Sequence, residues 1–70
     1  MENRVRIGNL MASIRESKGM TQRQMAEKCG VTFQNISKIE NGRYNVGVDV
    51  LSRMAEALGY EVTIARKAAE

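Results

Sequence analysis

Four polar side chains point in one direction from a segment near the middle of this sequence. Residues 33–41 carry Ile36 and Ile39 three positions apart, which places both on one face of a helix. At about 100° per residue, the opposite direction holds amide, hydroxyl and ammonium groups, on Gln34, Ser37, Lys38 and Asn41. Amides can hydrogen-bond adenine and an ammonium group can bond guanine. The spacing therefore indicates a helix that could contact base edges in a major groove, although a solvated polar face has the same composition.

A second short helix is predicted directly before this segment. Thr21 is a helix-capping residue type, and Gln24 three positions later completes a capping box. Gly30 can adopt the left-handed conformation that ends a helix. Thr32 then caps the following helix, and Gly42 comes after its end. The pattern predicts two short helices joined by a tight turn.

This unit resembles the Cro/repressor-type helix-turn-helix, also called the xenobiotic-response-element (XRE) family. The resemblance covers roughly residues 7–59. It rests on Thr21-Gln22, Ala26, Gly30, Ile36, Ile39 and Glu40-Asn41-Gly42, followed by Leu51, Met54, Ala55, Leu58 and Gly59. It implies an all-α, compact lambda-repressor-like domain of four or five helices.

The patterns divide the chain into four parts. Residues 1–6 are expected to be a flexible lead-in, residues 7–59 the helix-turn-helix domain, and residues 66–70 a polar tail. Residues 60–65 alternate apolar and polar and are rich in β-branched types, which predicts a strand.

A lone strand leaves its backbone groups unmatched. We therefore expect the 60–65 segment to pair with its copy across a dimer, with Tyr60, Val62 and Ile64 facing the core or the interface. A fifth helix or a loose tail are the alternatives.

The resemblance also assigns DNA contacts to this chain. Base contacts are expected from Gln34, Lys38, Ser37, Thr32 and Phe33. Phe33 has two interpretations, a contact with a thymine methyl group or packing back against the protein. Contacts with the DNA backbone are expected from Gln22, Arg23, Asn35, Asn41, Arg43 and Asn45.

Two charged residues each border a predicted apolar face. Arg15 follows the apolar positions of the first helix, and Glu40 has the same relation to Ile36 and Ile39. The family carries an Arg–Glu pair at the matching positions, so the resemblance implies a structural ion pair here. Two exposed charges, each contributing little, are the alternative.

Composition narrows the functional classes. The 70 residues carry a net charge of +3, which mildly favours a polyanionic partner. A single cysteine and no histidine leave no internal disulfide, no metal set and no nucleophile–base pair, so we expect neither an enzyme nor a cofactor. Cys29 is expected in the core. We see no signal peptide, no membrane segment and no room for a small-molecule domain, which predicts a cytoplasmic protein.

These observations predict a sequence-specific transcriptional regulator of double-stranded DNA. The expected form is a homodimeric repressor that reads an inverted-repeat operator with the 33–41 helix in the major groove. The alternative is an antitoxin-type protein that neutralises a partner toxin and also controls its own operon.

Overall fold

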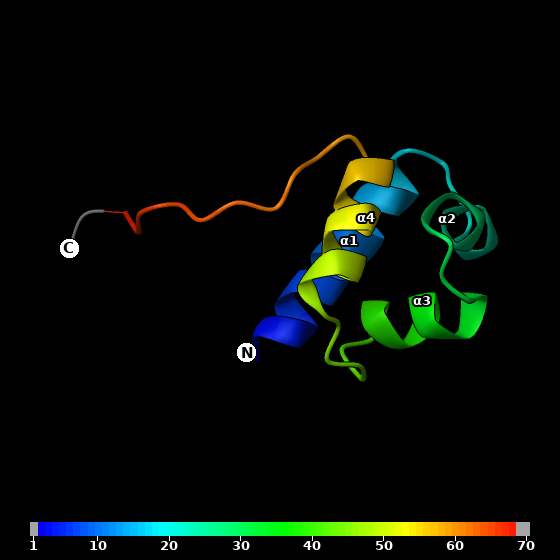
Figure 1. Ribbon diagram of the computed structural model, residues 1–70, viewed down its shortest axis with the longest axis horizontal. Helices are drawn as coiled ribbons and strands as arrows, with labels where there is room; N and C mark the ends of the chain where they lie inside the picture. The colour runs from blue at the N-terminus through cyan, green and yellow to red at the C-terminus, as the bar shows by residue number, and fades with distance from the viewer. Residues whose placement is uncertain (1, 69–70) are drawn as a thin grey trace.

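Four helices make up the regular structure of the computed structural model, which describes residues 2–68 (Figure 1). They are α1 (Asn3–Ser17), α2 (Gln22–Cys29), α3 (Phe33–Glu40) and α4 (Val48–Ala57). Helix α3 packs against both α1 and α2, and α2 also packs against α4. The all-helical class and the number of helices agree with the sequence analysis. No helix in the described part of the chain has the length and apolar character needed to cross a bilayer.

One apolar core joins all four helices. It contains Met11 of α1, the inner faces of the two central helices and the end of α4; its members are Met11, Met25, Ala26, Cys29, Ile36, Ile39, Met54, Ala55 and Leu58. Burial of these side chains is the main term that stabilises the fold. Val48 is 71% exposed because it occupies the first position of α4, where the chain enters from the connector.

Helix α1 begins earlier than the sequence predicted. We expected a flexible lead-in over residues 1–6, but α1 already starts at Asn3; Met1 lies outside the described residues. Glycine weakens a helix interior, which makes Gly8 an unfavourable residue near the start of a helix. Here Gly8 is buried against the backbone of Ile39, where a Cβ would collide with the Ile39 carbonyl oxygen. Val5 packs in the same way against Gly42.

The strand predicted over residues 60–65 is absent. From Tyr60 to Ala68 the chain has no regular secondary structure and projects away from the helices (Figure 1). A strand needs a neighbour for its backbone hydrogen bonds, and the described residues supply none. Pairing of this strand across a dimer is therefore not supported. Residues 60–68 form no fifth helix either, and residues 69–70 of the tail lie outside the described part.

The Gly8 contact predicts an unusual effect of a helix-favouring substitution. Alanine normally stabilises a helix interior over glycine by about 1 kcal/mol. In Gly8→Ala the collision with Ile39 should outweigh that gain and lower the free energy of unfolding by on the order of 1–2 kcal/mol. Urea denaturation followed by circular dichroism measures it. Asn9→Ala, at an exposed position of the same helix, is the control and should not destabilise. A Gly8→Ala variant as stable as the wild type would contradict the close crossing of α1 and α3.

Candidate nucleic-acid interface

The outer face of α3 is polar and accessible, as its spacing requires. Ile36 and Ile39 are 0% and 2% exposed, which fixes the inner face against the core. Gln34, Lys38 and Asn41 are exposed, and Ser37 is half-buried. Neither Gln34 nor Lys38 makes a side-chain hydrogen bond or ion pair within residues 2–68. Their amide and ammonium groups are therefore available to an external partner.

Local hydrogen bonds set the ends of α2 and α3. The Thr21 hydroxyl accepts from the Gln24 backbone N–H at 3.1 Å, and the Gln24 side chain accepts from the Thr21 N–H at 2.8 Å. This is the predicted capping box. Gly30 ends α2 at a φ of +67°, and the Thr32 hydroxyl accepts from the Asn35 N–H at 3.2 Å. The helix-turn-helix unit is therefore defined by bonds between neighbouring residues.

A buried ion pair ties the end of α3 to α1. Arg15 Nε donates to Glu40 Oε2 at 2.7 Å, and Arg15 Nη2 donates to Glu40 Oε1 at 3.1 Å. The two residues are 7% and 5% exposed. Arg15 Nη1 also donates to the Met20 carbonyl at 2.6 Å. The hydrogen bond that Arg15 donates to Glu40 raises the pKa of Arg15 in spite of the desolvation of its guanidinium, so Arg15 stays protonated.

Gln22 extends this pair into a three-helix network. Its Nε2 donates to Glu40 Oε1 at 2.9 Å, so the first residue of α2 is bonded to the last residue of α3. We expected this side chain to contact the DNA backbone. One amide hydrogen of Gln22 is engaged inside the protein and the other remains for such a contact. Sequence reasoning missed the internal bond, because no local pattern links positions 22 and 40.

Phe33 packs against the protein. Its ring is half-buried against the apolar core, and the Arg23 guanidinium lies over it, with Cζ 4.5 Å from the ring centroid. Of the two sequence-based interpretations of Phe33, the structure shows the packed arrangement. The Arg23–Phe33 contact links α2 to the first residue of α3 and has no signature in the sequence pattern.

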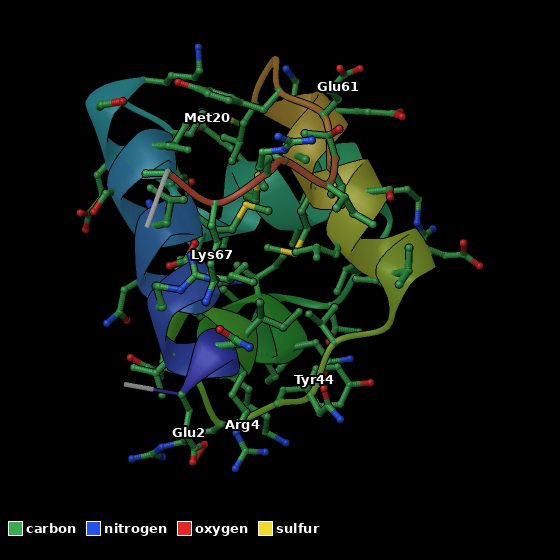
Figure 2. The ribbon with its side chains drawn as sticks, turned by 90° about the vertical axis from the view of Figure 1, so that its left-hand side faces the viewer. Glu2, Arg4, Met20, Tyr44, Glu61 and Lys67 are labelled. Carbon is green, nitrogen blue, oxygen red and sulfur yellow. The ribbon has the colours of Figure 1, made fainter. Side chains whose placement is uncertain are left out.

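The connector that follows α3 is hydrogen-bonded to the last turn of that helix. Gly42 adopts a φ of +72° and its N–H donates to the Ile39 carbonyl at 3.1 Å, while the Arg43 N–H donates to the Lys38 carbonyl at 2.9 Å. Arg43 and Asn45, both expected near the DNA backbone, are exposed. Arg4 of α1 lines a pocket with Tyr44 and Asn45, and Figure 2 shows Arg4 and Tyr44 at the same end of the molecule.

Cys29 lies in the core, as expected, at 3% exposure. Its Sγ lies 3.9 Å from the Arg53 carbonyl oxygen, and burial raises the pKa of the thiol. A protonated, inaccessible thiol is a poor nucleophile. Among the described residues, no three His, Cys, Asp or Glu side chains gather in a way that could hold a metal ion.

The fold and the polar outer face of α3 together define a helix-turn-helix protein. A family model described as Helix-turn-helix (HTH_3) matches residues 11–64, and the chain belongs to this family of XRE-type DNA-binding domains.

Three known proteins illustrate the relationship. An HTH-type transcriptional regulator from Methanothermobacter thermautotrophicus is 42% identical over 52 residues, which cover 74% of this chain and 75% of the relative. The immunity repressor protein of Bacillus phage phi105 is 35% identical over 57 residues, covering 81% of this chain but 40% of that repressor. A chain in the solved HipA–HipB–O2–O3 complex has the same fold, with a TM-score of 0.82, 24% identity and coverage of 97% and 96%.

Loss of one partner of the buried ion pair should destabilise the domain strongly. In Arg15→Met the carboxylate of Glu40 stays buried without its main partner, which typically costs about 3–5 kcal/mol. A large fall in melting temperature, or loss of helical structure at 25 °C, is expected by circular dichroism. The double variant Arg15→Met/Glu40→Met removes both charges and should regain much of the stability.

Glu16→Gln is the matched control for this experiment. Its carboxylate lies 3.7 Å from Arg15 but is 70% exposed, so its loss should change stability by less than about 1 kcal/mol. Equal melting temperatures for Arg15→Met and Glu16→Gln would show that the buried pair does not hold α3 in place.

Proposed function

We propose that this chain is a transcriptional repressor that binds a specific double-stranded DNA site by inserting α3 into the major groove. The observation that carries the proposal is the division of α3 into a buried face, fixed by Ile36, Ile39 and Glu40, and an opposite face whose polar groups have no partner within the described residues. Membership of the helix-turn-helix family supports DNA binding. The similarity to a phage immunity repressor supports repression.

Gln34 and Lys38 are the principal base contacts in this proposal. Both are exposed on the outer face, and their groups match adenine and guanine edges respectively. Ser37, between them and half-buried, is a secondary contact. Thr32 contributes less, because its hydroxyl already accepts the Asn35 N–H. Phe33 orders its neighbours instead of meeting a base, since its ring is packed against the core and Arg23.

Contacts with the DNA backbone are proposed on both sides of α3. Arg43 and Asn45 in the connector, with Asn41 at the end of α3, form one group, and all three are exposed. Gln22 and Asn35 lie at the beginnings of α2 and α3 and form the other. Such contacts supply affinity and salt sensitivity, while the base contacts supply the choice of sequence.

The two classes of contact predict different effects of substitution. Gln34→Ala should lower affinity for a site selected from random duplexes by about 1–3 kcal/mol and relax selectivity at one base pair. Arg43→Ala should weaken binding to all duplexes alike and reduce the slope of log K against log salt by about one. Fluorescence anisotropy over a salt series measures both. Uniform weakening by Gln34→Ala would contradict its role as a base reader.

A homodimer that reads an inverted repeat is part of the proposal. Val62 and Ile64 in the C-terminal segment, residues 60–68, are 45% and 99% exposed, and a second copy of the chain would cover this apolar surface. The start of the segment also borders an apolar groove of about 310 Å³ between α1 and α4. Two copies that cover these surfaces would present two α3 helices to half-sites one DNA turn apart.

Dimerisation through this segment predicts that substitution of Ile64 weakens self-association. Ile64→Asp should shift the protein towards monomer in a concentration series by analytical ultracentrifugation, because a charge would replace a buried apolar contact. Ala65→Asp adds the same charge at the neighbouring exposed position and is the control. A monomeric wild-type protein, or equal association of both variants, would refute this interface.

The antitoxin function is the second candidate. The observation in its favour is the match over almost the whole chain to one chain of the HipA–HipB–O2–O3 complex, although at 24% identity that match shows the fold alone. A protein partner would then cover the exposed segment around Ile64 in place of a second copy. A toxin gene beside the gene of this protein, with a product that binds it stably, would favour this alternative.

A further inference from the structure

The Arg23 guanidinium packs on an aromatic ring while its hydrogen-bonding capacity is unused. Its guanidinium lies over the Phe33 ring, 4.5 Å from the centroid. The structure contains no hydrogen bond or ion pair from the Arg23 side chain to any residue between 2 and 68. Arg15, by contrast, uses three of its nitrogens on Glu40 and Met20. A stacked guanidinium with free N–H groups is suited to binding an external acceptor.

The spacing of charged residues along α2 would allow Arg23 to pair with Glu27, but no such ion pair is present. Glu27 lies four residues later on α2, at the spacing that favours ion pairs on a helix surface. The structure contains no ion pair between these two side chains. Arg23 instead reaches across the turn to α3. Stacking on an aromatic ring keeps the guanidinium in one plane and leaves its N–H edge open.

The ring below Arg23 is itself immobilised. Phe33 is the first residue of α3, directly after the Thr32 cap, and packs against the apolar core. It therefore serves as a platform for the Arg23 guanidinium, directly before Gln34 in the sequence of α3. The guanidinium is thus held at the beginning of the helix that is proposed to enter the groove.

We propose that Arg23 reads a guanine in the half-site, donating from two guanidinium nitrogens to O6 and N7, and that Phe33 is the positioning residue that fixes its plane. This inference rests on the proposed DNA-binding function. Contact with a phosphate, which we assigned to Arg23 from the sequence, tolerates many orientations of a cation. Bidentate contact with guanine needs a fixed plane, which the stack supplies.

The test is selection of binding sites from a library of randomised duplexes, followed by anisotropy on the selected site. The wild type should select a guanine that Arg23→Ala no longer requires. Replacing that guanine by 7-deazaguanine, which lacks the N7 acceptor, should weaken wild-type binding by about five- to hundred-fold and leave Arg23→Ala unaffected. Arg23→Lys keeps the charge but loses the planar fork, so it should lose most of this preference.

Phe33→Leu tests the platform separately. Leucine keeps apolar contact with the core but removes the ring face, so the guanine preference should fall while the preference at the Gln34 position stays. Arg53→Ala, an exposed arginine on α4, is the control and should change neither site selection nor melting temperature.

Three results would overturn the inference. Equal weakening of Arg23→Ala on every duplex would make Arg23 a phosphate contact. A lower melting temperature for Arg23→Ala with unchanged site selection would make the stack purely structural. A guanine preference that Phe33→Leu leaves intact would remove the role of the ring. If the wild type selects no sequence at all, the proposed function itself fails, and that outcome is distinct from these three.

Discussion

The geometry of the proposed reader depends on one buried carboxylate, that of Glu40. It is the last residue of α3, and it accepts from Arg15 of α1 and from Gln22 of α2. Burying two charges costs several kcal/mol, which their attraction and hydrogen bonds must offset, so a well-packed apolar replacement could be as stable. An apolar replacement would lack the directional hydrogen bonds that the ion pair makes. The hydrogen bonds to Glu40 favour the observed orientation of α3, in which Gln34 and Lys38 are exposed.

The core and the close helix crossings support that arrangement. Ile36 and Ile39 insert into the core from the inner face of α3. Gly8 lets α1 approach the backbone at the end of α3 closely. A domain of this size buries a modest apolar area, so a few such contacts make up a large share of its stability. The α3 helix is thus held by its inner face, by the cap at its N-terminus and by its last residue. The side chains on its outer face are not needed to hold the fold together. Rigid presentation of a few polar groups is what direct readout of DNA needs.

The parts that could be predicted from the sequence are those set by neighbouring residues. The caps at Thr21 and Thr32, the turn at Gly30 and the spacing of Ile36 and Ile39 are local features, and they gave α2 and α3 almost to the residue. The Arg15–Glu40 pair came from its position beside two apolar faces, together with the family resemblance. The start of α1 was missed because glycine lowers helix propensity, whereas Gly8 is needed for a contact 31 positions away with Ile39.

The other errors have a similar origin. Residues 60–65 have the composition of a strand, but a strand forms only beside another, and the described residues hold no partner for it. The stack of Arg23 on Phe33 and the bond from Gln22 to Glu40 join residues on different helices, which no single-helix period encodes. These tertiary contacts determine which polar groups remain available, so the detailed contact list required the structure.

The central claim is that this surface selects a DNA sequence. Fluorescence anisotropy tests it most directly, with a duplex from upstream of the protein's own gene and a scrambled duplex of the same composition, each at two salt concentrations. The account predicts tighter binding to the native duplex and a preference that persists at the higher salt. Equal affinities that both collapse as salt rises would reduce the interface to a basic surface, and no binding to either duplex would contradict the account.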